Sequence, residues 1–135
     1  MARWGIRGVT GVVFAVMLVV GGCHRVQPIY KVEDHPVPAA AQKADLVTLE
    51  TAIYEAASST GWLVEKVNPG LMRATQKWRE HAATVDIVYS QKSYSINYAG
   101  SANLKADQDF IHRRYNSLVV KLEQEIERRL YKVGS

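Results

Sequence analysis

Apolar residues recur at intervals of three and four in two stretches of the chain, which is the period of a helix with one buried face. The first stretch, residues 44–59, starts beside Asp45, a residue type that caps helices, and ends before Gly61. The second stretch, residues 107–131, has acidic residues at its start and basic residues at its end, as the helix dipole favours. The apolar positions are Leu46, Leu49, Ile53 and either Ala56 or Ala57 in the first stretch and Ile111, Tyr115, Leu118, Leu122, Ile126 and Leu130 in the second. The pattern predicts an N-terminal and a C-terminal helix.

Between these helices the apolar period changes to two, the period of a strand with one buried face. The alternating stretches are residues 62–67, 71–79, 83–90 and 94–99. Turn-forming residues separate them, for example Pro69 and Gly70, because proline presets φ and glycine accepts a positive φ. Since the connections are short, neighbouring strands are predicted to be antiparallel and to form a meander.

The order of these elements predicts the fold class α+β. A four-stranded antiparallel meander is flanked by an N-terminal and a C-terminal helix, in the order α-β-β-β-β-α. Both helices are expected to cover the apolar face of the sheet and to leave its polar face wet, which makes a two-layer sandwich. We assign this domain to residues 44–133.

Residues 23–43 precede the predicted domain and contain few large apolar groups. Pro28, Pro36 and Pro38 stiffen this segment and favour an extended, polyproline-like course. About 20 residues at ~3.1 Å each would hold the domain up to ~60 Å from its point of attachment. We interpret the segment as a tether, either a spacer that sets the reach of the domain or a disordered leader.

Residues 1–22 have the layout of a secretory signal peptide. Arg3 and Arg7 form a short basic start, and an apolar run from Val9 to Val20 follows. This run has about a dozen residues, against the ~20 that a membrane-spanning helix needs, so a permanent span is the weaker interpretation. Two glycines and then Cys23, the single cysteine of the chain, complete the segment.

The run Val20-Gly21-Gly22-Cys23 resembles the lipobox of bacterial lipoproteins, in which an aliphatic residue and two small residues precede a cysteine. The resemblance implies that the signal peptide is cut before Cys23 and that lipid, palmitate included, is attached to this residue. Two or more acyl chains make membrane attachment effectively stable. His24 stands where an Asp often retains such lipoproteins in the inner membrane, so the resemblance favours the outer membrane, facing the periplasm. The alternative is a secreted protein with a free thiol.

A longer resemblance covers about residues 44–130. It rests on Gly61-Trp62, Pro69-Gly70, Val85 to Tyr89, Tyr94 to Tyr98, Ser101, Asn103-Leu104, Ile111-His112 and Tyr115-Asn116. These motifs resemble a group of small bacterial lipoproteins whose activity is uncharacterised. The resemblance implies the helix–meander–helix fold and transfers no activity.

Charge narrows the choice of partners. The formal net charge of the whole chain is +4, but Arg3 and Arg7 belong to the signal peptide, and the remainder carries only about +2. This small excess, in a protein directed to the periplasm, gives no reason to expect a nucleic acid as partner. With one cysteine, no internal disulfide can form.

The chain shows no recognisable catalytic or metal-binding motif. The four histidines are scattered along the sequence, and no Cys/His pair, glycine-rich phosphate loop or nucleophile elbow is present. We therefore expect no metal, no cofactor and no catalytic residue, and we predict that the protein is not an enzyme.

Two groups of polar residues are candidates for binding. Arg73, Lys77 and Arg79 share one face of the predicted second strand, which either meets an anionic partner or is a solvated strand face. The other group is a polar corner at the start of the predicted C-terminal helix, formed by Asn103, His112 and Asn116. Its residues either bind a ligand or satisfy backbone groups where a strand becomes a helix.

The sequence thus favours a membrane-anchored lipoprotein of the bacterial cell envelope that acts as a non-catalytic binding or interaction module. Its partners would be the membrane, through Cys23, and another envelope protein or a cell-wall polymer. The alternative is a small-ligand-binding protein or enzyme that uses the polar corner. A third possibility is a purely structural subunit.

Overall fold

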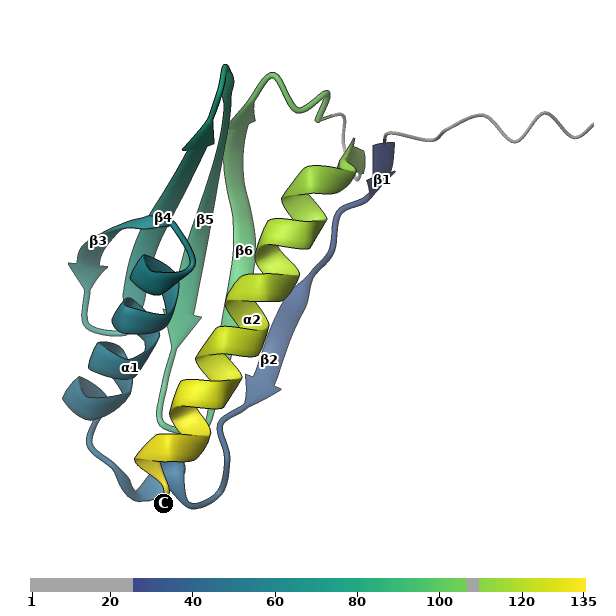
Figure 1. Ribbon diagram of the computed structural model, residues 1–135. Helices are drawn as coiled ribbons and strands as arrows, with labels where there is room; N and C mark the ends of the chain where they lie inside the picture. Colours follow the sequence, from purple (N-terminus) through teal and green to yellow (C-terminus); the bar gives the residue numbers. More distant parts are fainter. Residues whose placement is uncertain (1–25, 107–109) are drawn as a thin grey trace, which may run out of the picture.

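The computed structural model describes residues 26–106 and 110–135. Its centre is a five-stranded antiparallel sheet with the strand order β2-β6-β5-β4-β3, and two helices lie against one face of this sheet (Figure 1). A second sheet consists of the short strands β1 and β7. The elements are β1 (Val26–Pro28), β2 (Val32–Pro36), the 3-10 turn η1 (Ala41–Lys43), α1 (Leu46–Ser59), β3 (Leu63–Asn68), β4 (Leu71–Trp78), β5 (His81–Tyr89), β6 (Ser93–Ala102), β7 (Phe110–His112) and α2 (Arg113–Val133).

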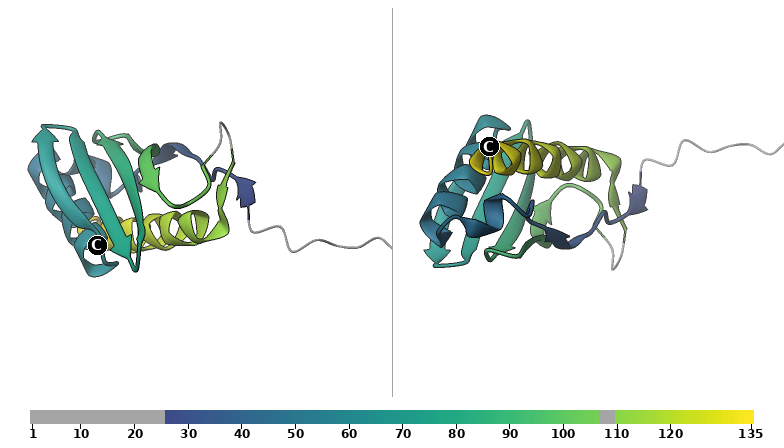
Figure 2. Two further views of the ribbon diagram at one scale, coloured as in Figure 1. Left: turned by 90° about the horizontal axis from the view of Figure 1, so that it is seen from above. Right: turned by 90° about the horizontal axis from the view of Figure 1, so that it is seen from below.

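The α+β class and the helix–meander–helix order are confirmed. Strands β3 to β6 follow one another as antiparallel neighbours, and α1 and α2 lie together on the same side of them (Figure 2). Met72 and Ala74 of β4 and Ile87 of β5 are fully buried, as the alternation of apolar and polar residues predicts. The side chain of Asp45 caps α1 by accepting a hydrogen bond from the Thr48 amide at 2.8 Å.

The prediction of a tether over residues 23–43 is wrong for the part that the structure describes. Strand β2 pairs with β6 and forms one edge of the main sheet, so the sheet has five strands instead of four. Val32, Val37 and Ala41 belong to the hydrophobic core, with exposed fractions of 3%, 2% and 0%. Proline is tolerated in β2 because an edge strand leaves alternate backbone amides unpaired. The domain therefore begins well before residue 44.

Polar side chains also hold this N-terminal segment against α2. His35 Nδ1 lies 2.9 Å from Glu123 Oε1, and the hydroxyl of Tyr30 donates a hydrogen bond to Glu123 Oε2 at 2.7 Å. The ring of His35 stacks on Tyr94 of β6 with a centroid distance of 4.9 Å. These contacts explain why a segment rich in proline and polar residues is ordered.

The predicted start of the C-terminal helix at residue 107 is also wrong. Residues 110–112 form β7, which pairs with β1, and α2 begins only at Arg113. Ile111 is fully buried, as its place in the apolar stripe requires, but it reaches the core from a strand. The amide of His112 donates to the carbonyl of Leu104 at 2.9 Å, which holds this strand beside the end of the meander.

The predicted signal peptide, Cys23 and His24 lie outside the described residues, as do Asp107 and Asp109. Among the helices that the structure describes, none combines the length and the apolar character needed to cross a membrane.

The buried position of Val32 leads to a test of the revised domain boundary. Val32→Ala is expected to lower the free energy of unfolding by about 2 kcal/mol, because it removes two buried methyl groups and leaves a cavity. Urea denaturation followed by circular dichroism would measure this loss. Val88→Ala is the matched control, since Val88 is a strand valine that is 45% exposed, and its loss should be less than half as large. Equal stability of Val32→Ala and the unmodified protein would restore the tether interpretation.

Candidate functional site

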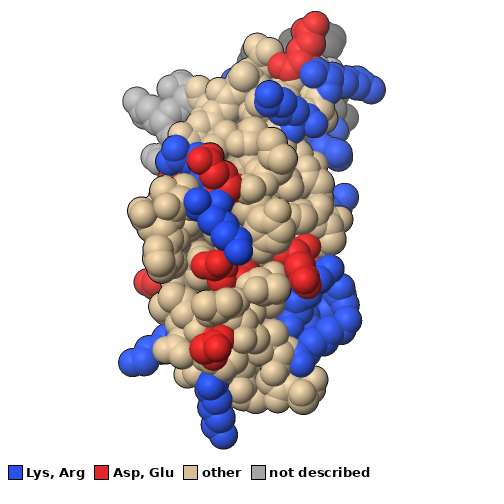
Figure 3. Space-filling model, turned by 90° about the vertical axis from the view of Figure 1, so that its left-hand side faces the viewer, with Lys and Arg blue, Asp and Glu red and all other residues tan. Residues whose placement is uncertain are grey.

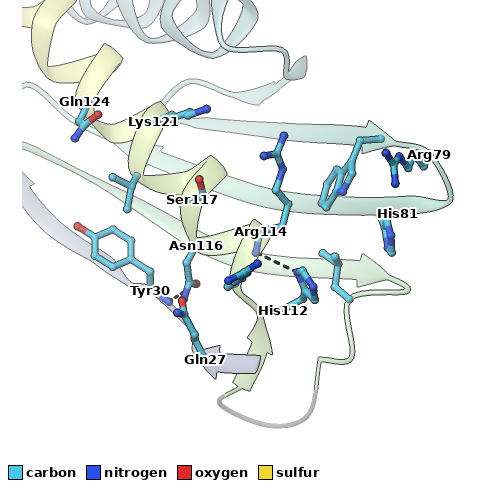
Figure 4. Close-up of a pocket in the computed structure, with 14 residues that line it drawn as sticks. Gln27, Tyr30, Arg79, His81, His112, Arg114, Asn116, Ser117, Lys121 and Gln124 are labelled. Atoms are coloured by element: carbon cyan, nitrogen blue, oxygen red, sulfur yellow. Dashed lines mark hydrogen bonds between the residues drawn. The ribbon is translucent and has the colours of Figure 1, made fainter. Parts of the chain in front are cut away.

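A broad, open hollow lies at the end of the molecule where α2 begins. Its volume is about 1260 Å³. Side chains from four parts of the chain line it: the N-terminal half of α2, the β4–β5 hairpin, the segment around β1, and Leu104 and His112, which precede α2 (Figure 4). Segments far apart in the sequence thus meet at one place.

Helix α2 supplies one wall through the spacing of its residues. Arg114, Ser117 and Lys121 follow at intervals of three and four, so they lie along one face of the helix. The buried stripe of the same helix includes Tyr115 and Leu118, which pack into the core and leave the polar face outside. Burial of one side of α2 therefore directs these polar residues toward the hollow.

The β4–β5 hairpin supplies a second wall. Trp78 and His81 are paired across the two strands, and their rings are 5.6 Å apart. Arg79 lies in the turn between them with φ of 53°, a left-handed conformation that costs a non-glycine residue about 1 kcal/mol or more. All three residues line the hollow.

The charge of the hollow is strongly one-sided. Four permanently cationic residues line it, Arg79, Arg113, Arg114 and Lys121, and no acidic residue is among the described residues that do. None of the four forms an ion pair within the described part of the chain. Positive charges are therefore brought together without a carboxylate to balance them.

The other described arginines behave differently. Arg73 pairs with Asp86, Arg128 pairs with Glu125, and Arg129 pairs with both Glu55 and Glu125. Hydrogen bonds from Arg128 and then from Arg129 lower the pKa of Glu125 to about 2. Figure 3 shows several Lys and Arg side chains in its upper right part with an acidic group beside them, and acidic groups next to basic ones lower down. The unpaired arginines are those at the hollow.

The start of α2 adds to the positive potential. A helix N-terminus carries a partial positive charge, which favours acidic residues in the first turn. This turn has none and holds Arg113 and Arg114 instead. The Nδ1 atom of His112 accepts a hydrogen bond from the Arg114 amide at 3.2 Å and so caps the helix. An anion bound beside this turn would relieve an unfavourable arrangement of charges.

The predicted polar corner is brought together only in part. His112 and Asn116 line the hollow, but Asn103 does not. Asn103 lies in a turn with φ of 58°, and its Nδ2 donates to the carbonyl of Glu80 at 2.6 Å while its own carbonyl lies 2.8 Å from His81 Nδ1. The residue thus joins the end of β6 to the β4–β5 hairpin.

Asn116 likewise holds backbone groups. Its Oδ1 accepts from the Tyr30 amide at 2.9 Å, and its Nδ2 donates to the carbonyl of Pro28 at 2.8 Å. It therefore fastens the connection between β1 and β2 to α2. Of the two interpretations of the corner, satisfaction of backbone groups describes both asparagines.

The predicted basic strand face is divided by the structure. Arg73 and Lys77 share the open face of the sheet, but Arg79 lies beyond the end of β4 and lines the hollow on the helix side. Arg73 is bound through Nε and Nη2 to Asp86, at 2.8 and 3.1 Å. On the open face Arg73 is therefore neutralised and Lys77 is left without an ion pair among the described residues, whereas Arg79 belongs to the hollow.

Sequence reasoning missed most of the cationic wall. Arg113 was noted only as one member of the polar cluster at the helix start. Arg114 and Lys121 were not identified as binding candidates, and neither were Trp78 and His81. The sequence does contain one signal for this wall, the doublet Arg113-Arg114 at the start of α2, where the helix dipole disfavours cations. The prediction placed the helix start six residues earlier, so the doublet was not recognised as a pair of cations in the first turn.

The described residues contain no group of three or more His, Cys, Asp or Glu side chains placed to hold a metal ion. Comparisons of the chain with family models, with curated proteins and with solved structures gave no match. The arrangement of side chains at the hollow is therefore the basis for assigning a function.

The role of Asn116 can be tested by its removal. Asn116→Ala is expected to lower the free energy of unfolding by about 1–2 kcal/mol, because it breaks hydrogen bonds to two backbone groups. Thermal or urea denaturation would measure the change. Asn97→Ala is the matched control, since Asn97 is exposed on the open face and has no side-chain hydrogen bond among the described residues. If the free energy of unfolding fell by the same small amount in both variants, the proposal that Asn116 holds the β1–β2 connection against α2 would be refuted.

Proposed function

We propose that this protein is a lipid-anchored protein of the bacterial cell envelope and acts as a non-catalytic module that binds an anionic partner in the hollow at the start of α2. The observation that carries the proposal is the set of four unpaired cations, Arg79, Arg113, Arg114 and Lys121, around one open depression. Elsewhere in the described chain the arginines are paired.

The anchoring part of the proposal rests on the sequence. A basic start, a short apolar run and two glycines precede Cys23, in the arrangement of a lipobox. The residue that follows Cys23 favours the outer membrane, with the domain in the periplasm. Because β1 already includes Val26, three residues after Cys23, the domain would be held close to the membrane.

The chemistry of the hollow suits phosphate or carboxylate groups. An arginine guanidinium binds the oxygens of such groups through two parallel hydrogen bonds, and a lysine adds a mobile charge. Trp78 and Tyr30 contribute aromatic surface to the same depression. Lipid headgroups, a cell-wall polymer or an envelope protein with exposed acidic groups would each provide such anions.

The alternative of an enzyme or small-ligand site at the polar corner has less support. Asn116 uses both the oxygen and the nitrogen of its side-chain amide to hold backbone groups, and Asn103 uses its amide nitrogen in the same way. His112 caps α2 through its Nδ1 atom. These contacts favour the binding module over catalysis at the corner.

Lipidation can be tested directly in a bacterial host. Cells supplied with labelled palmitate should incorporate the label into the unmodified protein and not into Cys23→Ser, because the thiol forms the bond to the lipid. The two proteins are compared at equal amounts by gel electrophoresis and immunoblotting. Equal labelling of both would refute the anchor.

Anion binding can be tested with residues 24–135, which contain the whole described core. Addition of pyrophosphate should shift the amide NMR signals of α2 residues near Arg114 and of the β4–β5 hairpin. The double variant Arg114→Gln with Lys121→Gln should bind roughly tenfold more weakly, which corresponds to ~1.4 kcal/mol.

The matched control removes two charges from the opposite end of the domain. Lys43 lies in η1 and Lys92 in the β5–β6 turn, both outside the hollow. The double variant Lys43→Gln with Lys92→Gln should therefore bind pyrophosphate as tightly as the unmodified domain does. Equal weakening in both double variants would show that only net charge matters and would remove the hollow as the site.

A further inference from the structure

We propose that the anionic groups bound by the hollow are the phosphates of lipid headgroups in the same membrane that holds the anchor, so that this end of the domain faces the bilayer. This inference rests on the proposed attachment through Cys23. It adds the chemical identity of the partner and the orientation of the domain.

The first argument is the position of β1. Val26 pairs with His112, the residue that precedes Arg113, so the chain enters the domain beside the hollow. Three residue steps separate Cys23 from Val26, and they span at most about 11 Å even when fully extended. A lipid on Cys23 would therefore hold Val26 within about this distance of the membrane surface, and the start of α2, on the paired strand, about 5 Å further.

The second argument is the long axis of the domain. The β4–β5 hairpin and the start of α2 lie at one end, and η1, the β5–β6 turn and the C-terminus lie at the other (Figure 1). Helix α2 has 21 residues and is thus about 31 Å long at ~1.5 Å per residue. Surface potentials fall off over about 8 Å at physiological salt. With the anchor at the β1 end, only cations at that end are near enough to contact headgroups.

The third argument is the kind of residue that lines the hollow. Unpaired cations near an anionic membrane surface each strengthen attachment about fivefold, which corresponds to about 1 kcal/mol. Tryptophan and tyrosine are enriched at membrane interfaces because one part of the ring system is apolar and one part is polar. Trp78 and Tyr30 lie among the four cations, and Tyr30 is 38% exposed.

The fourth argument is the shape of the depression. It is broad and open, and it spans the turns of α2 from Arg113 to Gln124 on one side and the hairpin on the other. Such a surface contacts several headgroups at once. Because the anchor raises the local concentration of lipid, individually weak contacts are sufficient to orient the domain.

The experiment uses the mature, lipidated protein in vesicles and reads the position of Trp78. Once the signal peptide is removed, Trp62 and Trp78 are the remaining tryptophans, and Trp62→Phe leaves Trp78 as the single reporter. Quencher groups attached to lipid headgroups should quench Trp78 strongly in vesicles that contain phosphatidylglycerol. Quenching should be weaker in phosphatidylcholine alone and should decrease as salt is added.

Charge variants in the same background identify the contact. Arg113→Gln with Arg114→Gln should reduce the quenching in phosphatidylglycerol vesicles to the level in phosphatidylcholine, because two of the four cations are lost. Lys43→Gln with Lys92→Gln removes the same charge from the far end and should leave the quenching unchanged. A second reporter, Tyr131→Trp combined with Trp62→Phe and Trp78→Phe, places the tryptophan near the C-terminus and should not be quenched.

The outcomes separate the two proposals. If pyrophosphate binds the hollow of residues 24–135 but Trp78 of the lipidated protein is not quenched, the membrane orientation is overturned and the anion site stands. Equal quenching of Trp78 in both kinds of vesicle would mean that the short chain between Cys23 and Val26 alone keeps Trp78 near the membrane. The contact between the cations and anionic headgroups would then be overturned. If neither pyrophosphate nor phosphatidylglycerol vesicles respond to Arg113→Gln with Arg114→Gln, both proposals fail.

Discussion

Burial of one stripe of α2 against the rest of the core is the constraint on which the candidate site depends. Tyr115, Leu122 and Ile126 are fully buried, and a helix with one face fixed in this way has no freedom to rotate about its axis. Arg114 and Lys121 must then lie on the outer side. The same packing that stabilises the domain therefore directs these cations toward solvent beside the β4–β5 hairpin.

The N-terminal segment, through the edge strand β2, determines how closely the domain would lie to the proposed attachment site. Contacts of Tyr30 and His35 with Glu123, together with burial of Val32 and Val37, make this segment part of the domain. A tether of ~60 Å would leave the orientation of the domain free. Under the proposed attachment through Cys23, a domain that includes Val26 would have one particular end close to the attachment point, and the charge of that end would then matter for binding.

The hollow also retains several locally unfavourable arrangements. Two arginines occupy a helix first turn that favours carboxylates, and Arg79 adopts a left-handed conformation in a tight turn. Arg73, by contrast, is matched to Asp86 on the neighbouring strand. The left-handed conformation is not confined to the hollow, since Asp34, Asn103 and Lys105 also have a positive φ. The distinctive feature of the hollow is the arginine pair at a helix start, an arrangement that a bound anion would stabilise.

The sequence by itself determined the two helices, the meander between them and the faces that are buried, because these features follow from periodicity along the chain. It did not determine that β2 joins the sheet, since a five-residue edge strand with polar outer residues has almost no periodic signal. Nor did it determine the helix start, because Ile111 fits the helical stripe while lying in a strand. Only the tertiary structure decided that Arg79 lines the same hollow as Arg113 and Arg114, and that Arg73 forms an ion pair with Asp86. Contacts between residues distant in the chain depend on strand register and helix rotation, which the spacing of residues does not specify.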